Sequence, residues 1–464
     1  MKTLTIALGL LLSISLPTLV WSQEEKIPPI IMLRAEEDYS FLQDQDSTVL
    51  FLQPLKWIPL NSNNSMSLTL GGEYRPRIEH FTNRNYSAED ETFYSQRLSF
   101  HAALRLGAGI RLFGELYHGY VTEGTALLES DDLDLHQGFL EWKIQEANGK
   151  KTLLRVGRQE MGLGASRLVG IREGPNMRRT FDMARIQYRT KGASVNAFYG
   201  REVAVGSEAF DNASGIFDEQ SSKPGLWGVY VQNVTSHEVR KIDVYYLGFS
   251  SNLARFNDVV GEEQRHTLGI RSYGDIGRFS YNTELIYQFG EIGDSDISAY
   301  NFEADWQYIL QQDGWKPTIG LRLDWSSGDA AVEDGKVQTF NPFFVNPAIY
   351  SLAAVNTPAN STSLHPNFTF YPAKDLSIFV DYTLFYRTRE TDGLYSPPRF
   401  QSREANGLSE RHIGDVVGLQ IMYEFNRNIS FDLRSSYFLA GKFIKATGDA
   451  ENTFYIAPTL NFEF

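Results

Sequence analysis

The sequence predicts one all-β domain, a transmembrane antiparallel β-barrel of about 18 strands (16–18), monomeric, with long extracellular loops. Apolar and polar side chains alternate with a period of two through most segments after residue 67, as in strands with two different faces. Aromatic residues make up 13% of the 464 residues, and their density on the apolar face would overfill one soluble core. Opposite charges recur a few positions apart on the polar face, as at Arg322 and Asp324, which suits a water-filled interior.

Other architectures fit the sequence less well. A β-helix would show a repeat of about 20 to 30 residues, and none is present. After the N-terminus no segment approaches the length of about 18 consecutive apolar residues that a spanning helix requires. The chain has no cysteine, which excludes a disulfide framework, a thiolate metal site and a lipoprotein anchor.

The N-terminus predicts secretion. Lys2 precedes an apolar run over residues 4–20, and small residues at Val20 and Ser22 indicate a signal peptide over residues 1–22. Residues 23–66 contain prolines that forbid a central strand, so we expect a periplasmic N-terminal segment that packs into or under the barrel. Residues 67–464 form the barrel, and the predicted location is the outer membrane of a Gram-negative bacterium, in contact with its lipid.

The strands follow in order from the alternation. In the first, Leu68 and Leu70 share one face, and Glu73, Arg75 and Arg77 share the other. Strands are expected at residues 67–79, 97–105, 110–116, 137–144, 153–160, 181–189, 193–201, 226–233, 241–250, 266–276, 278–290, 297–310, 316–326, 367–371, 376–387, 412–425, 429–440 and 454–464. The last ends on Phe464, which resembles the terminal aromatic that serves outer-membrane porins as an assembly signal, so the barrel-assembly machinery is an expected partner.

The connections alternate in length, as barrels require. Short turns are expected at residues 106–109, 275–277 and 426–428, and long polar loops at 202–225, 328–364 and 388–411. Residues 341–347 are too apolar for a solvated loop, and an inward constriction or lid and simple packing on the rim fit this composition equally well. Asp329, Glu333 and Asp334 are a weak calcium candidate without the spacing of a known loop, so we expect no metal site and no cofactor.

One window is strongly cationic. Residues 153–189 hold eight arginines and three acids, a local charge of +5 in a chain whose total is −14. Arginine is always charged and pairs with carboxylate in two-point fashion, so an arginine-lined channel attracts anions. For each arginine an internal salt bridge that braces the wall is an equally good interpretation, with partners coming from across the lumen. The candidate pore residues are Arg75, Arg97, Arg155, Arg158, Arg167, Arg185, Arg189, Arg322, Arg387 and Arg434, with Asp182, Glu303, Asp305, Asp324 and Asp381 as acidic partners.

Several motifs resemble the alginate-export family of outer-membrane barrels. The central ones are Gly157-Arg158-Gln159-Glu160, Arg167-Leu168-Val169-Gly170 and Arg178-Arg179-Thr180-Phe181-Asp182. Supporting matches are Glu37-Asp38-Tyr39-Ser40, Pro54-Leu55-Lys56-Trp57-Ile58-Pro59-Leu60, Gly71-Gly72-Glu73-Tyr74-Arg75, Ser327-Gly328-Asp329, Leu364-His365-Pro366 and Asp392-Gly393-Leu394-Tyr395. The resemblance implies an 18-stranded monomeric barrel with an electropositive pore for anionic uronate polysaccharide, and it favours Arg155, Arg158, Arg167, Arg185 and Arg189 as pore arginines.

The function predicted first is a channel that passes an anionic, alginate-like polysaccharide or its oligosaccharides by diffusion. The alternative is a general or anion-selective porin for small solutes. A barrel enzyme needs a nucleophile and a base, and the eight histidines are scattered without an accompanying serine or aspartate motif. An energy-coupled transporter needs a plug domain, for which the segment before the first strand is too short. The net charge of −14 argues against a nucleic-acid partner.

Overall fold

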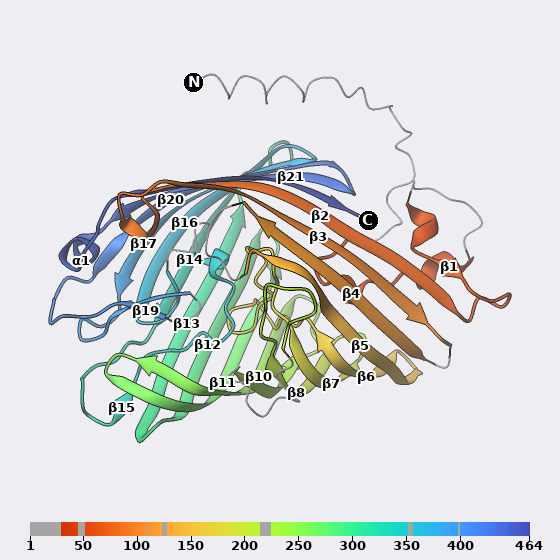
Figure 1. Cartoon of the computed structure of the whole chain (residues 1–464), viewed down its shortest axis with the longest axis horizontal. Helices are drawn as coiled ribbons and strands as arrows, with labels where there is room; N and C mark the ends of the chain where they lie inside the picture. Colours follow the sequence, from red (N-terminus) through yellow and green to blue (C-terminus); the bar gives the residue numbers. More distant parts are fainter. Residues whose placement is uncertain are drawn as a thin grey trace.

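The structure, a computed structural model, describes residues 29–44, 52–107, 109–122, 128–213, 224–350, 356–397 and 400–464. The predicted signal peptide lies outside these residues. In the described part, 18 antiparallel strands form one barrel (Figure 1). The strands are β2 (Ser67–Thr82), β3 (Glu91–Arg105), β4 (Ile110–Val121), β5 (Asp131–Ala147), β6 (Lys150–Gln159), β7 (Phe181–Arg189), β8 (Ser194–Glu202), β9 (Gly225–Gln232), β10 (Arg240–Phe256), β11 (Val259–Ile276), β12 (Phe279–Ile292), β13 (Ser295–Ile309), β14 (Thr318–Ser326), β16 (Ser361–Ala373), β17 (Leu376–Arg387), β20 (His412–Asn426), β21 (Ile429–Ala440) and β22 (Thr453–Glu463).

The barrel is closed because its first strand pairs with its last. β2 pairs with β22 from Glu73–Glu463 to Thr82–Phe454, and each other neighbouring pair is also antiparallel. The predicted fold class and the strand number of 18 are therefore confirmed. Helical structure in the described residues is limited to α1 (Lys442–Ala446) and short 3-10 turns. None of the described helices is long and apolar enough to cross a bilayer.

The two faces of the strands differ as the alternation predicts. Outward side chains such as Leu268 and Leu285 are about half exposed, whereas Glu284, next to Leu285 in β12, is buried. In β2 the acidic and basic residues Glu73, Arg75 and Arg77 are buried. A barrel wall that is apolar outside and charged inside matches a protein whose outer face contacts lipid.

The two ends of the barrel differ in their connections. At the terminal end all connections between described strands are short, and there lie the C-terminus and the N-terminal segment, whose strand β1 (Ile58–Pro59) pairs with the start of β2. The loop end has the long connections, together with two tight turns at residues 257–258 and 293–294. At the loop end lie α1, β15 (Lys336–Val337), β18 (Leu394–Ser396) and β19 (Phe400–Arg403). Figure 1 shows the terminal end on the right and the loop end on the left.

Some expected strand limits are wrong. The short strand expected at residues 367–371 is the longer β16, so the preceding loop ends at Asn360. Pro366 lies opposite Leu321 of β14 and is skipped in the register with β17, where a residue without an N–H is tolerated. β5 and β10 extend well beyond the predicted ranges 137–144 and 241–250.

The interior is less uniformly polar than expected, because two loop segments fold into it. Residues 160–180, between β6 and β7, and residues 338–347, between β14 and β16, cover an apolar part of the inner wall. Phe343 stacks on Phe249 of β10 with 4.7 Å between ring centroids, and Phe344 meets the Phe181 ring edge-on at 5.0 Å. The apolar stretch 341–347 therefore folds inward, and packing on the rim is excluded. Its backbone is hydrogen-bonded to the other segment, since the Phe344 N–H donates to the Leu168 carbonyl over 2.8 Å.

Candidate functional site

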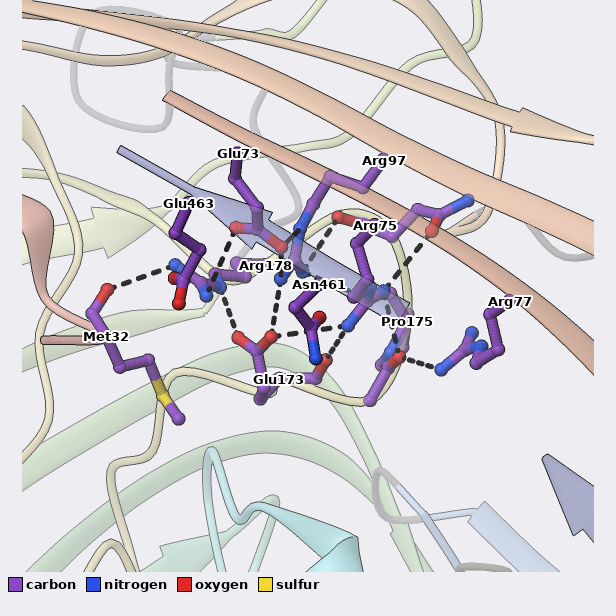
Figure 2. Close-up of polar contacts among 12 residues, drawn as sticks. Met32, Glu73, Arg75, Arg77, Arg97, Glu173, Pro175, Arg178, Asn461 and Glu463 are labelled. Carbon is purple, nitrogen blue, oxygen red and sulfur yellow. Dashed lines mark hydrogen bonds and ion pairs between the residues drawn. The ribbon is translucent and has the colours of Figure 1, made fainter. Parts of the chain in front are cut away.

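The inward segment 160–180 is fastened to the wall of β2 and β3 by buried ion pairs (Figure 2). The Arg97 guanidinium pairs with Glu173 of this segment over 2.5 Å and with Glu73 of β2 over 2.6 Å, and Arg75 pairs with Glu173 over 3.2 Å. Arg75 also donates to the Pro175 carbonyl over 2.9 Å. Burial alone would raise the pKa of Glu173, but Arg178, Arg97 and Arg75 hold it well below its usual range. Arg75 and Arg97, two of the candidate pore residues, therefore attach this segment to the wall.

The same segment reaches the opposite wall through Arg167. This guanidinium pairs with Glu303 of β13 over 2.7 Å and lies 3.6 Å from Asp324 of β14. Tyr350 donates a hydrogen bond to Glu303 over 2.7 Å, and Asp305 pairs instead with Arg322 over 3.1 Å. Residues 160–180 therefore bridge the lumen between β2–β3 and β13–β14.

The rest of the cationic window is neutralised partly by Asp182, which lies inside the window, and otherwise by acids outside it. Arg158 pairs with Asp182 over 3.0 Å, and Arg155 pairs with Glu141 over 2.6 Å. Arg155, Arg185 and Arg189 also converge on Glu36 of the N-terminal segment. Sequence reasoning missed Glu36 and Glu141 as partners; the acidic run around Glu36 was visible, but nothing in it indicated its place in the barrel.

Arg387 does not line the lumen. It is fully buried at the loop end, where its guanidinium donates to the carbonyls of Asp392 and Leu408 over 2.8 and 2.7 Å and lies 3.8 Å from the Phe443 ring centre. The expectation that it contacts solute is wrong, since backbone carbonyls bind its donors. Asp381 accepts a hydrogen bond from Thr383 over 3.1 Å and forms no ion pair with a described residue.

A cavity of about 390 Å³, called here the loop-end cavity, lies between the inward segments and the wall of β2, β21 and β22. Its charged lining among the described residues consists of five arginines and two glutamates: Arg77, Arg84, Arg172, Arg179 and Arg434, with Glu79 and Glu129. Burial and the neighbouring Arg179 lower the pKa of Arg172 to about 9, which reflects this concentration of positive charge. Of the candidate pore residues only Arg434 lines this cavity.

A second cavity of about 500 Å³, the terminal-end cavity, is lined by residues of the turns β7–β8 and β9–β10 and by the ends of these strands. Arg189, Lys191 and Lys241 supply positive charge here, and Glu238 is the acid among the described lining residues. Arg189 is a candidate pore residue with 41% of its side chain exposed. Both cavities can therefore bind an anion without first breaking a fully buried ion pair.

The predicted assembly signal, Phe464, and the calcium candidate around Asp329 both form hydrogen bonds with other parts of the chain. The Phe464 carbonyl accepts hydrogen bonds from Arg34 over 2.5 Å and from the Gly72 N–H over 3.0 Å, which fixes the end of β22 beside β2. Asp329 accepts from Asn257 over 3.1 Å, and Asp334 accepts from the Lys336 N–H over 2.9 Å. Within the described ranges, no group of three or more histidine, aspartate or glutamate residues is arranged to hold a metal ion.

Comparison with known proteins gives a family match and a fold match. Residues 66–457 match the family model described as "Alginate export". Acinetobacter baumannii OccAB1 superimposes with a TM-score of 0.58 at 12% identity, covering 89% of this chain and 99% of that one. Pseudomonas aeruginosa OpdO gives 0.56 at 12% identity, covering 86% and 97%. Pseudomonas aeruginosa OccK2 (OpdF) in complex with glucuronate gives 0.55 at 13%, covering 86% and 98%. At such identities these structures show the fold alone. No curated protein matches.

Proposed function

Since this chain belongs to the alginate export family, and is thus an outer-membrane channel of a Gram-negative bacterium and not an enzyme, we propose that it passes anionic uronate polysaccharide or its oligosaccharides by diffusion. In such barrels the short turns face the periplasm and the long loops face outward. The loop-end cavity then opens toward the exterior and the terminal-end cavity toward the periplasm.

The observation that carries this proposal is the surplus of positive charge among the residues that line the loop-end cavity, five arginines against two glutamates. The acids that pair with Arg84, Arg179 and Arg434 lie outside this lining, so the guanidinium groups are what a solute in the cavity meets. Each uronate unit carries one planar carboxylate, which the guanidinium fork of arginine binds with two parallel hydrogen bonds. In a narrow site with low-dielectric walls, this surplus raises the local concentration of anions. A uronate oligomer carries a row of carboxylates. It therefore suits a channel with cationic side chains in a cavity at each end.

The complex of OccK2 with glucuronate supports the same chemistry, because a barrel of similar fold binds a sugar acid. The alternative function, an anion-selective porin for small solutes, is favoured by the two inward segments. They line the loop-end cavity of about 390 Å³, and the terminal-end cavity measures about 500 Å³. Cavities of this size suit a few sugar units better than a long polymer.

The test is a planar-bilayer measurement of current block by uronate oligomers of increasing length. R84Q/R434Q removes two of the five cavity arginines, each paired with a partly exposed acid, Glu91 or Asp432, so neither change strands a fully buried charge. We expect weaker block and lower anion selectivity than in the wild type. R255Q, at an exposed position outside both cavities, is the matched control.

Neutral oligosaccharides of equal length should not block any variant. Block by glucuronate monomers but not by longer oligomers would favour the small-solute porin. Equal block of wild type and R84Q/R434Q would contradict the role assigned to the loop-end cavity.

A further inference from the structure

The carboxylate of Glu36 lies in the lumen among three arginines of the barrel wall. Its Oε1 is 3.0 Å from Arg155 Nη1 and 3.5 Å from Arg185 Nη1, and its Oε2 is 2.9 Å from Arg189 Nη2. Arg155 belongs to β6 and the other two to β7, where Arg155 and Arg185 are cross-strand partners. We call Arg155, Arg185 and Arg189 the arginine triad. The triad binds Glu36 as it would bind any other carboxylate of suitable reach.

The segment that carries Glu36 is also held by contacts that do not involve this side chain. The Arg111 guanidinium donates to the Ala35 carbonyl over 2.8 Å, and Arg178 donates to the Met32 carbonyl over 3.1 Å (Figure 2). Arg34 donates to the Phe464 carbonyl over 2.5 Å. These backbone contacts place the 3-10 turn Arg34–Glu36 against the wall. The Glu36 carboxylate is therefore presented to the triad by a segment with its own anchors.

One member of the triad, Arg189, differs in exposure from the ion pairs that brace the wall, whereas Arg155 and Arg185 are only 6% and 12% exposed. Arg97 and Glu73 are almost completely buried, with 0% and 4% of their side chains exposed. Arg189 is 41% exposed and also lines the terminal-end cavity, while Glu36 is 19% exposed. A carboxylate entering that cavity can therefore reach Arg189 without displacing the wall.

We propose that the arginine triad is a carboxylate-binding subsite at the periplasmic end of the channel, and that Glu36 occupies it as a tethered competitor of the substrate. The subsite deepens the proposed function and rests on it, since the competing ligand is a uronate carboxylate. When an oligomer displaces Glu36, one sugar carboxylate takes its place between Arg155 and Arg189. The neighbouring units then lie in the terminal-end cavity beside Lys191 and Lys241.

The tether sets which ligands can compete. A group on a short flexible linker acts at an effective concentration of order mM, and Glu36, on a segment fixed by its own anchors, acts at this concentration or above it. A single uronate in dilute solution therefore does not displace Glu36. An oligomer that already engages Lys191 and Lys241 gains its own effective concentration at the triad. Burial would raise the pKa of Glu36, but the three arginines hold it well below its usual range, so the competitor is charged at neutral pH. The subsite thus discriminates by chain length.

The test compares E36Q with E37Q. Glu37 is the adjacent residue and pairs with Arg34 over 3.0 Å, outside the triad. Uronate monomer and trimer are added to the side of the bilayer that faces the chain termini. In E36Q we expect the half-blocking concentration to fall about tenfold or more for the monomer and less for the trimer, whereas E37Q behaves as the wild type.

A chemical rescue provides a second test that does not depend on the E36Q substitution alone. The chain has no cysteine, so E36C carries the only thiol. Labelled with 2-carboxyethyl methanethiosulfonate before refolding, E36C regains a carboxylate and should return to wild-type block. Labelled with an uncharged methyl methanethiosulfonate, it should behave as E36Q.

The outcomes separate the two proposals. Unchanged periplasmic-side block in E36Q and in both labelled forms would overturn the tethered competitor, and block that depends on Arg84 and Arg434 would still support the channel for uronates. Stronger periplasmic-side block in E36Q combined with no effect of R84Q/R434Q would retain the triad subsite and reject the loop-end cavity.

Discussion

At the scale of single residues, exposure separates two roles of arginine in this barrel. Arg97 and Arg167 are buried among carboxylates and, through Glu173 and Glu303, hold the inward segment 160–180 between opposite walls. Arg189 and Arg434 each pair with one acid and keep 41% and 29% of their side chains in contact with solvent. The first kind determines the shape of the lumen, and the second kind is available to a solute.

The bridging role of Arg167 predicts a large loss of stability on its removal. R167M leaves Glu303 and Asp324 buried without their cation, and such a change costs about 3–5 kcal/mol. R322Q is the comparison, because Arg322 and Asp305 are both about one-fifth exposed and solvent compensates part of the loss. Urea unfolding of the barrel in lipid vesicles measures both. Losses of equal size would show that Arg167 is not a buried brace.

The ionisation of Glu36 predicts how the docking of the N-terminal segment depends on pH. Its folded pKa lies below its ordinary value of 4.5, so its contribution to stability is present above pH 4.5 and is lost as the pH falls toward the folded value. The difference in unfolding free energy between wild type and E36Q should be constant from about pH 6 to 8 and shrink by about pH 3. A difference that stays the same at about pH 3 would contradict the ion pairing.

The sequence predicted only some of the salt-bridge and hydrogen-bond partners of these arginines. Charge alternation on the strands predicted that acids would lie inside with the arginines, and Glu303, Asp324 and Asp182 do pair with Arg167 and Arg158. Arg387 looked the same in the sequence as Arg434, yet backbone carbonyls bind it at the loop end. Glu36 was missed because it precedes the barrel by about 30 residues, and the period of two contains no information about where that segment docks.

At the scale of elements, the strands were predictable and the inward segments were not. The period of two directly sets which face of a strand is apolar, but a loop's path depends on which apolar wall is left uncovered inside. Residues 341–347 were recognised as too apolar for solvent. Their position became clear only from the aromatic contacts with Phe181 and Phe249 on β7 and β10.

These aromatic contacts predict that the segment 338–347 controls the width of the lumen. F343S/F344S removes the stack on Phe249 and the edge contact with Phe181, and each such aromatic pair contributes about 0.5–1.5 kcal/mol beyond its buried area. The segment should then leave the wall, and single-channel conductance should rise. F210S, at a position with 64% exposure, is the control and should leave conductance unchanged. Equal conductance in all three proteins would mean that this segment does not narrow the path.

At the scale of the whole molecule, the two cationic cavities lie toward opposite ends of the barrel, and the inward segment 160–180 lines the one at the loop end. Under the proposed function, a polyanion that crosses the barrel would meet one cluster of cations on entry and another on exit. The family match and the closed barrel of 18 strands agree with such a path, and the signal that predicted both was distributed over nearly the whole chain.

Two separate clusters predict block that depends on the side of addition. Lys191 and Lys241 lie in the lining of the terminal-end cavity, and no salt bridge joins either one to another described residue. In K191Q/K241Q, uronate oligomers added at the periplasmic face should block less, whereas block from the external face should match the wild type. R84Q/R434Q should show the opposite pattern. Both effects should fade with salt, because the screening length falls from about 30 Å at 0.01 M to about 3 Å at 1 M. If each double variant weakened block equally from both faces, the cavities would act as one site, and recognition at two separate mouths would be excluded.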